Sequence, residues 1–283
     1  MSLRKFIAIL ALVVVALALF YAFAFKKEEA TNIASEVKLK LSPARSARLI
    51  VVVDNNPGPE KLETAWGISI YVEVDSVRLL FDTGPSPELL KKNLEALGIS
   101  IADINAVVIS HEHGDHAGGL VAVAEAKPGA TVYIPAGASS SLKERIEKLG
   151  LKPVGISKAT VLAKGVAVTA PLRGPPYEIA LLIVVEGKGL IVVTGCAHPG
   201  VDNIVMYAHN VTGLPVYAVV GGFHLIGASA HRLGEIAETF KKLGVKELYP
   251  IHCSGEEARQ FFAKELGDAY KGGGVGAVIV IKS

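Results

Sequence analysis

The sequence has 283 residues with a formal net charge of +2, and 51% of its residues are hydrophobic. That length suffices for one large domain or two small ones with a sizeable core. The balanced charge, with no basic stripe carrying interleaved aromatic residues, excludes nucleic acid as a favoured partner. The 2 cysteines, Cys196 and Cys253, are too few for a disulfide framework. The low contents of cysteine and methionine, which are thermolabile residues, favour a thermophilic source.

The chain opens with an apolar segment, residues 6–25, that contains no charged residue. Such a segment is long enough to cross a bilayer as a helix. The alternative is a cleaved signal peptide, because residues 22–24 resemble a small-x-small cleavage site. We predict an uncleaved transmembrane anchor in residues 1–27, followed by a polar tether in residues 28–47. The protein is then expected at a membrane, on a side that the flanking basic residues do not decide.

Residues 48–283 are predicted to form the globular domain. Expected strands cover residues 48–54, 66–74, 77–81, 107–109, 131–134, 160–163, 166–169, 177–186, 190–193, 215–220, 247–250 and 275–281. Expected helices cover residues 87–97, 139–149, 201–211, 231–243 and 255–266. Hairpins that give way to strand–helix alternation, once in each half, predict an α/β fold with mixed sheets.

A cluster of metal-capable side chains follows the short apolar strand before residue 110. It consists of His111, His113, Asp115 and His116. In an extended segment, residues i and i+2 point the same way, so His111 and His113 can bind one cation from one side. Gly114 lets the chain turn, which directs Asp115 and His116 to a second cation. Imidazole and carboxylate ligands suit zinc, iron, manganese or cobalt.

Three more histidines, His198, His224 and His252, follow predicted strands. Glycines stand directly before the Phe223-His224 pair, which suggests that the backbone there approaches a ligand closely. His224 is therefore a candidate for a substrate contact or a proton donor, with a structural role as the alternative.

The pattern His-x-His-x-Asp-His at residues 111–116 resembles the signature of the metallo-β-lactamase superfamily. The resemblance implies a four-layer αβ/βα sandwich with two divalent metal ions at one edge between the sheets. It also places the superfamily's usual bridging aspartate at Cys196, and the usual histidine of the preceding hairpin is missing from residues 169–176. We therefore expect His198 to supply the missing ligand. Cys196 is either a thiolate ligand or a buried packing residue.

The same resemblance assigns two further roles. His252 matches the superfamily's final ligand and is expected at the second metal ion. Asp82 matches an aspartate that holds the metal-binding loop through hydrogen bonds and so orients the histidine ligands. The predicted metal ligands are thus His111, His113, Asp115, His116, His198 and His252, and the predicted catalytic residues are Asp115 and His224.

Further motifs narrow the resemblance over residues 48–283. They lie at residues 53–55, 65–69, 81–84, 194–200, 221–225 and 252–255, and together resemble the subfamily of archaeal dihydropterin–ribofuranosylaminobenzene phosphate synthases. We predict a metal-dependent hydrolase with a binuclear centre, of zinc or alternatively iron or manganese. It would activate water on a small ester or phosphoester substrate. The alternatives are a transferase like that subfamily and a non-catalytic membrane-anchored binding protein.

Overall fold

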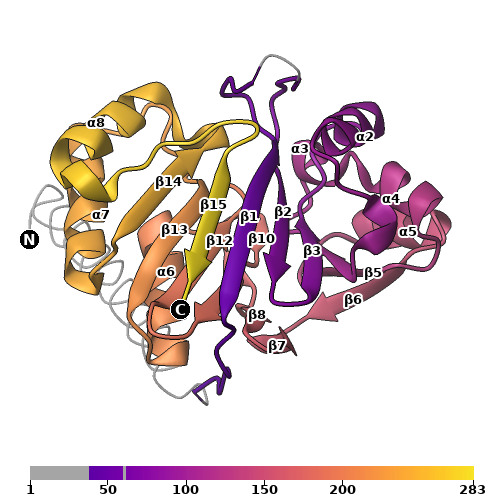
Figure 1. Ribbon diagram of the computed structural model, residues 1–283, viewed down its shortest axis with the longest axis horizontal. Coiled ribbons are helices and arrows are strands. Elements are labelled where there is room, and N and C mark those ends of the chain that lie inside the picture. The colour runs from indigo at the N-terminus through magenta and orange to yellow at the C-terminus, as the bar shows by residue number, and fades with distance from the viewer. Residues whose placement is uncertain (1–37, 60–61) are drawn as a thin grey trace, which may run out of the picture. The chain divides into compact units, whose positions relative to one another are not determined.

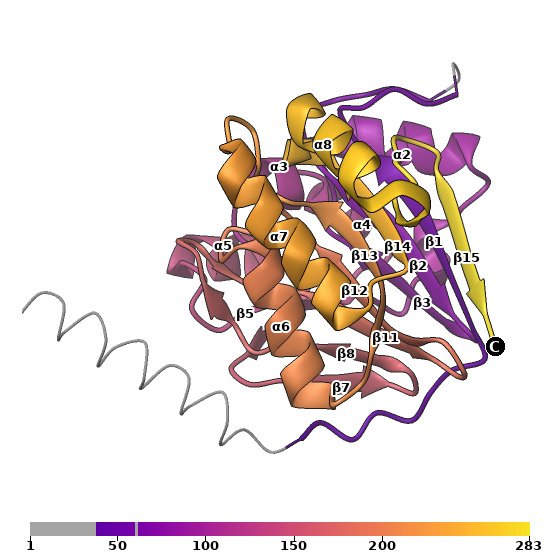
Figure 2. The same ribbon diagram turned by 90° about the vertical axis from the view of Figure 1, so that its left-hand side faces the viewer.

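The computed structural model describes residues 38–59 and 62–283. From Leu39 onward the chain forms two β-sheets packed face to face, with helices on their outer sides (Figure 1). In the view of Figure 2, α6, α7 and α8 lie in front of the sheets and α2 and α4 lie behind them. The predicted α/β class with mixed sheets is confirmed.

The first sheet has seven strands in the order β15-β1-β2-β3-β4-β5-β6. Their bounds are β1 Ser46–Val53, β2 Ser69–Val74, β3 Val77–Phe81, β4 Ala106–Val108, β5 Thr131–Pro135, β6 Lys152–Ile156 and β15 Val278–Lys282. Pairing is antiparallel from β15 to β3 and parallel from β3 to β6. The helices between these parallel strands are α2 Pro87–Ala96, α3 Gly114–Ala117, α4 Leu120–Ala126 and α5 Ser140–Lys148, with the 3₁₀ helix η1 Ile101–Asp103.

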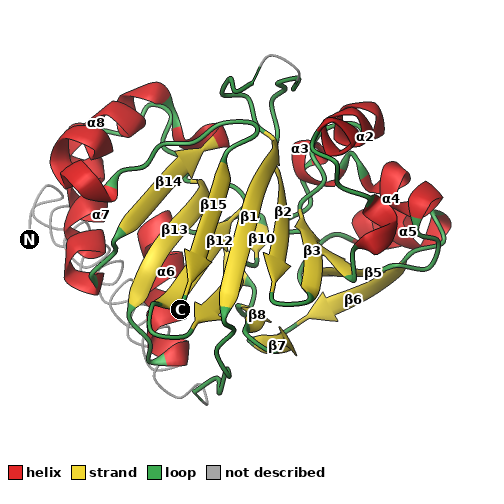
Figure 3. Cartoon of the chain, viewed as in Figure 1, coloured by secondary structure: helices red, strands yellow, loops and turns green. Residues whose placement is uncertain are grey.

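The second sheet has six strands in the order β14-β13-β12-β11-β8-β7 (Figure 3). Their bounds are β7 Thr160–Ala163, β8 Val166–Val168, β11 Leu181–Val185, β12 Gly189–Thr194, β13 Val216–Gly222 and β14 Glu247–Ile251. Strands β12, β13 and β14 are parallel and are connected by α6 Val201–Thr212 and α7 Ala230–Leu243. The remaining elements are α8 Glu256–Leu266, the 3₁₀ helices η2 His252–Ser254 and η3 Gly267–Ala269, and a separate hairpin of β9 Leu172–Arg173 and β10 Tyr177–Glu178.

The alternation of side chains along the strands creates two apolar layers. In β1, Leu49 and Val51 point into the core between the two sheets, whereas Ile50 and Val52 pack under the helices of the first sheet. All four are buried. At about 25 cal/mol per Å² of apolar surface removed from water, these two layers dominate the stability of the fold.

One predicted strand is wrong. The sequence predicts a single strand over residues 177–186, but the structure divides it into β10 and β11. The break occurs because the backbone N–H groups of Ile179 and Ala180 donate elsewhere, to the Ser110 carbonyl at 3.0 Å and the Thr169 hydroxyl at 3.0 Å. Glu178 is thereby turned into the protein interior, where it is 1% exposed.

The predicted membrane localisation is corrected. No helix in the described residues, 38–59 and 62–283, is long and apolar enough to cross a bilayer. The predicted anchor, residues 1–27 with its apolar run 6–25, and the predicted tether up to residue 37 lie outside the described residues. Within the part of the predicted tether that the structure describes, Ala44 is buried and forms a β-bridge with Val185 of β11. The boundaries of the predicted domains stay a prediction.

Candidate metal centre

The residues predicted to be functional lie just beyond the carboxyl ends of strands in both sheets. Asp82 follows β3, residues 110–116 follow β4, residues 195–198 follow β12, His224 follows β13 and His252 follows β14. Because β3 and β4 are parallel, as are β12, β13 and β14, these loops gather at one edge of each sheet. Segments far apart in the sequence therefore meet in one site.

The first cluster consists of His111, His113 and His198, whose candidate ligand atoms lie within 4.8 Å of one another. His111 Nε2 is 3.0 Å from His113 Nδ1, as expected for residues i and i+2 of an extended segment. The ring of His198 lies edge-on to both, with centroids 4.8 Å from His111 and 4.9 Å from His113. The structure thus brings together the three residues that the sequence analysis assigned to the first metal ion.

The second cluster consists of Asp115, His116 and His252, whose candidate ligand atoms also lie within 4.8 Å of one another. Asp115 Oδ2 lies 3.4 Å from His252 Nε2 and 3.6 Å from His116 Nε2. Gly114 begins the short helix α3, so Asp115 and His116 leave the extended path of His113. The predicted division of the histidine motif between two clusters follows from this turn.

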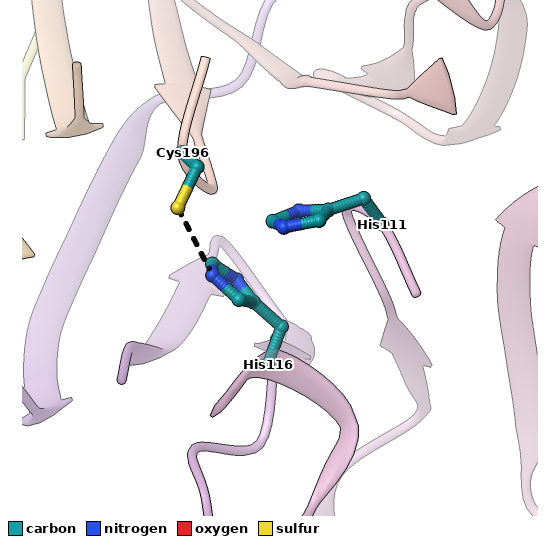
Figure 4. A group of neighbouring side chains, drawn as sticks. All are labelled: His111, His116 and Cys196. Atoms are coloured by element: carbon teal, nitrogen blue, oxygen red, sulfur yellow. Dashed lines mark hydrogen bonds between the residues drawn. The ribbon is translucent and has the colours of Figure 1, made fainter. Parts of the chain in front are cut away.

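Cys196 lies between the clusters. Its sulfur lies within 4.8 Å of the candidate ligand atoms of His111 in the first cluster and His116 in the second (Figure 4). The Cys196 thiol is 3.2 Å from His116 Nε2, to which it can donate a hydrogen bond. The pKa of Cys196 is raised, mainly by a hydrogen bond with Cys253 and secondly by burial.

Hydrogen bonds fix which nitrogen of His116, His111 and His252 faces the centre. The Asp82 carboxylate accepts from the Ser110 backbone at 2.7 Å, the Ser110 hydroxyl at 2.6 Å and His116 Nδ1 at 2.7 Å. Since the Ser110 proton goes to Asp82, His111 Nδ1 donates to the Ser110 oxygen at 2.9 Å. His252 Nδ1 likewise faces the Asn55 carbonyl oxygen at 3.0 Å. In each case Nε2 is left to face the centre.

The electrostatics of the site leave His111, His198 and Asp115 ready to bind a cation. Burial lowers the pKa of His111 well below its usual range and that of His198 to about 4. Burial alone would raise the pKa of Asp115, but the neighbouring His252 and His116 lower it to about 2. Burial would lower the pKa of His116, and the Asp82 carboxylate reverses this and raises it. Metal binding requires neutral imidazoles and ionised carboxylates, which are the states favoured for His111, His198 and Asp115. The raised pKa of His116 favours its protonated form, so a cation binding there must displace that proton.

Sequence reasoning missed Glu178. Its carboxylate is buried against residues 195–198, and its Oε1 accepts hydrogen bonds from Gly195 and Cys196 at 3.1 Å and from Ala197 at 2.9 Å. Burial raises its pKa to about 7, although the backbone donors of Ala197 and His198 act to lower it. The only sequence signal was an acidic residue at the start of an otherwise apolar run.

His224 stands beside the first cluster. Its ring centroid lies 4.5 Å from that of His198, and its side chain is exposed. Its backbone has a positive φ of 53° and donates to the Cys253 sulfur at 3.3 Å. Hydrogen bonding to Cys253 raises the pKa of the His224 imidazole, and burial acts against this. The histidine predicted to contact substrate thus lies next to the centre and is accessible.

Comparison with known proteins identifies the family of this chain. Residues 67–212 match the family model described as the metallo-beta-lactamase superfamily. The chain belongs to the metallo-β-lactamase superfamily. The mixed α/β sandwich with two sheets that this superfamily implies is confirmed, and residues 38–59 and 62–283 contain no helix that could span a bilayer.

Three relatives illustrate the match. The 7,8-dihydropterin-6-methyl-4-(beta-D-ribofuranosyl)-aminobenzene-5'-phosphate synthase of Methanocaldococcus jannaschii is 32% identical over 254 residues, which cover 72% of this chain and 86% of the relative. The crystal structure of Tm1679, a metal-dependent hydrolase of the beta-lactamase superfamily, matches with a TM-score of 0.72 and 27% identity, over 84% of this chain and 100% of that chain. The metallo-beta-lactamase fold protein YhfI from Bacillus subtilis has a TM-score of 0.61 at 16% identity, over 83% and 99% of the two chains, and shows the fold alone. The predicted resemblance to the synthase subfamily is confirmed.

Metallo-β-lactamase membership implies divalent metal ions, and two buried atoms fit them. His198 Nε2 and His252 Nε2 are buried and have no hydrogen-bond partner among the described residues. A buried polar atom without a partner costs about 1–3 kcal/mol, so such atoms call for an explanation. One of them belongs to each cluster, and a cation at each cluster would supply the partner. The residues present therefore fit the implied ions.

Proposed function

We propose that this chain is a metal-dependent hydrolase in which two three-residue clusters hold two divalent ions. His111, His113 and His198 would hold the first ion, and Asp115, His116 and His252 the second. The observation that carries this proposal is the pair of buried Nε2 atoms, one in each cluster, that have no hydrogen-bond partner among the described residues. Imidazole and carboxylate ligands favour zinc, with iron or manganese as the alternatives.

When bound, divalent ions supply Lewis acidity and make water acidic enough to lose a proton near neutral pH. The chain's own part is to orient and to move protons. Asp82 and Asn55 hold the His116 and His252 rings with Nε2 directed inward. Asp115 stays ionised at neutral pH and can accept a proton as well as bind a cation. These roles suit the hydrolysis of an ester or phosphoester.

His224 is proposed as the group that donates a proton to the leaving atom. It is accessible and lies beside His198, and it belongs to neither cluster. We expect His224→Ala to lower kcat by about 10²–10⁴-fold, the usual contribution of a general acid, and to leave metal content unchanged. His231→Ala is the control, because His231 is exposed on α7 and its side chain is 85% accessible. Loss of metal in parallel with activity would make His224 a ligand instead.

A transferase is the second candidate function. The 32% identical relative is named for a product that joins a dihydropterin to a ribofuranosylaminobenzene phosphate. In this chain Trp66 is 52% exposed, and its ring lies 4.9 Å from that of His252. An exposed aromatic face beside the centre suits a flat ring of the substrate.

One experiment separates the two reactions. Purified, metal-loaded full chain is incubated in ¹⁸O-labelled water with a panel of phosphoesters, lactones and thioesters, and separately with the pterin and aryl ribofuranosyl phosphate pair. Hydrolysis is expected to place ¹⁸O in the product of one or more panel members. A coupled product without ¹⁸O, together with no turnover of the panel, would overturn the hydrolase in favour of the transferase.

A further inference from the structure

The loop that carries His198 is bound to a buried carboxylate. The backbone N–H groups of Gly195, Cys196 and Ala197 donate to Glu178 Oε1, and that of His198 donates to Oε2 at 2.9 Å. Ala197 has a left-handed φ of 58°, which lets successive N–H groups face one point. Such a concave run of N–H groups is an anion-binding nest. Here the anion comes from the chain itself.

The hairpin of β9 and β10 also contacts His198 directly. Gly174 lies in the turn of this hairpin, and a Cβ added there would meet the Pro176 carbonyl oxygen at 2.3 Å and His198 Cβ at 2.6 Å. The hairpin therefore contacts this loop in two ways: its backbone packs against His198, and Glu178 binds the N–H groups of residues 195–198. This is the same hairpin in which the sequence analysis found no histidine, between residues 169 and 176.

We propose that Glu178 is a positioning residue that fixes the loop of residues 195–198 so that the His198 imidazole faces His111 and His113. The inference rests on the proposed function, in which His198 is a metal ligand. The hairpin then serves the first ion indirectly: it contributes a carboxylate that holds the ligand loop from behind. A residue that merely satisfies buried N–H groups would affect stability, whereas a positioning residue also affects how the first ion is bound.

Glu178→Gln discriminates between these roles because the two oxygens of Glu178 have different partners. An amide oxygen can still accept from Gly195, Cys196 and Ala197, but the amide NH₂ must then face the His198 N–H. Two donors cannot share a hydrogen bond, and turning the amide over would set its NH₂ against the other three N–H groups. The substitution therefore perturbs the loop at His198 while changing side-chain volume little.

The test uses the full chain as wild type, Glu178→Gln, His198→Ala and the control Glu186→Gln, which makes the same change at an exposed site. Affinities for Zn²⁺ are measured by competition with a chromophoric chelator, and the visible spectrum of the Co²⁺-substituted protein reports ligand geometry. For Glu178→Gln we expect one of the two ions to bind about 10–100-fold more weakly, the usual effect of losing a residue that orients a ligand. We also expect an altered Co²⁺ spectrum and an unchanged circular dichroism spectrum.

The outcomes separate the inference from the proposed function. Wild-type affinity and spectrum in Glu178→Gln, with one ion lost in His198→Ala, would overturn the positioning role alone. Two ions bound at full affinity in His198→Ala would overturn both. If Glu178→Gln does not fold, Glu178→Asp is measured in the same way, since it keeps the charge but withdraws the carboxylate. Failure of both variants to fold would also contradict a positioning role, because that role predicts a folded chain.

Discussion

His198→Ala protein is expected to bind one divalent ion in place of two. Without His198 the first ion would have only His111 and His113, and catalytic zinc sites normally use three protein ligands. We expect affinity for that ion to fall by more than about 100-fold, beyond the loss caused by an orienting residue. Metal content is measured by elemental mass spectrometry after dialysis of protein purified without a metal-affinity tag.

The matched control for this measurement is His231→Ala. This substitution also removes an imidazole, but His231 is exposed on α7 and belongs to neither cluster. It should retain the wild-type metal content. Two full equivalents of metal in His198→Ala would indicate that Cys196 is the third ligand. Its sulfur lies within 4.8 Å of the candidate ligand atoms of His111 and His116.

The second large effect is expected for Asp82→Asn, which should lower the free energy of unfolding by about 3 kcal/mol. Asp82 and His116 form a fully buried pair at 2.7 Å, and breaking such a pair costs about 3–5 kcal/mol. The lower end applies because the amide keeps one oxygen acceptor. If the amide NH₂ takes the place of Oδ2, it cannot accept from either the Ser110 hydroxyl or His116 Nδ1.

Urea unfolding of the metal-free protein measures this effect without the added stability of bound ions. Asp103→Asn is the control, because Asp103 is an exposed carboxylate in η1. Asp82→Asn should also bind the second ion more weakly, since His116 loses the partner that directs its Nε2 inward. An unchanged unfolding midpoint would show that the Asp82 network does not stabilise the fold.

The parts of the site that depend on local geometry could be predicted from the sequence. The spacing of His111 and His113 in an extended segment, and the turn at Gly114, are enough to divide the motif between two clusters. The sequence also identified His198, His224 and His252 as strand-end residues, and they gather at one edge because the strands that they follow are parallel.

The parts that depend on distant contacts could not be predicted. Glu178 lies 20 positions before His198, and only the folded hairpin brings its carboxylate to that loop. The break between β10 and β11 arises from donors claimed by Ser110 and Thr169, which no periodicity in residues 177–186 reveals. Hydropathy alone led to the membrane localisation, which the described helices do not bear out.

The central claim is that two clusters each hold one divalent ion, and anomalous X-ray diffraction from crystals of the zinc-loaded protein tests it most directly. Two anomalous peaks are predicted, with Zn–N and Zn–O distances of about 2.0–2.2 Å. One peak should lie among His111, His113 and His198, and the other among Asp115, His116 and His252. A single peak, or two peaks of which either lies outside these residues, would contradict the binuclear centre.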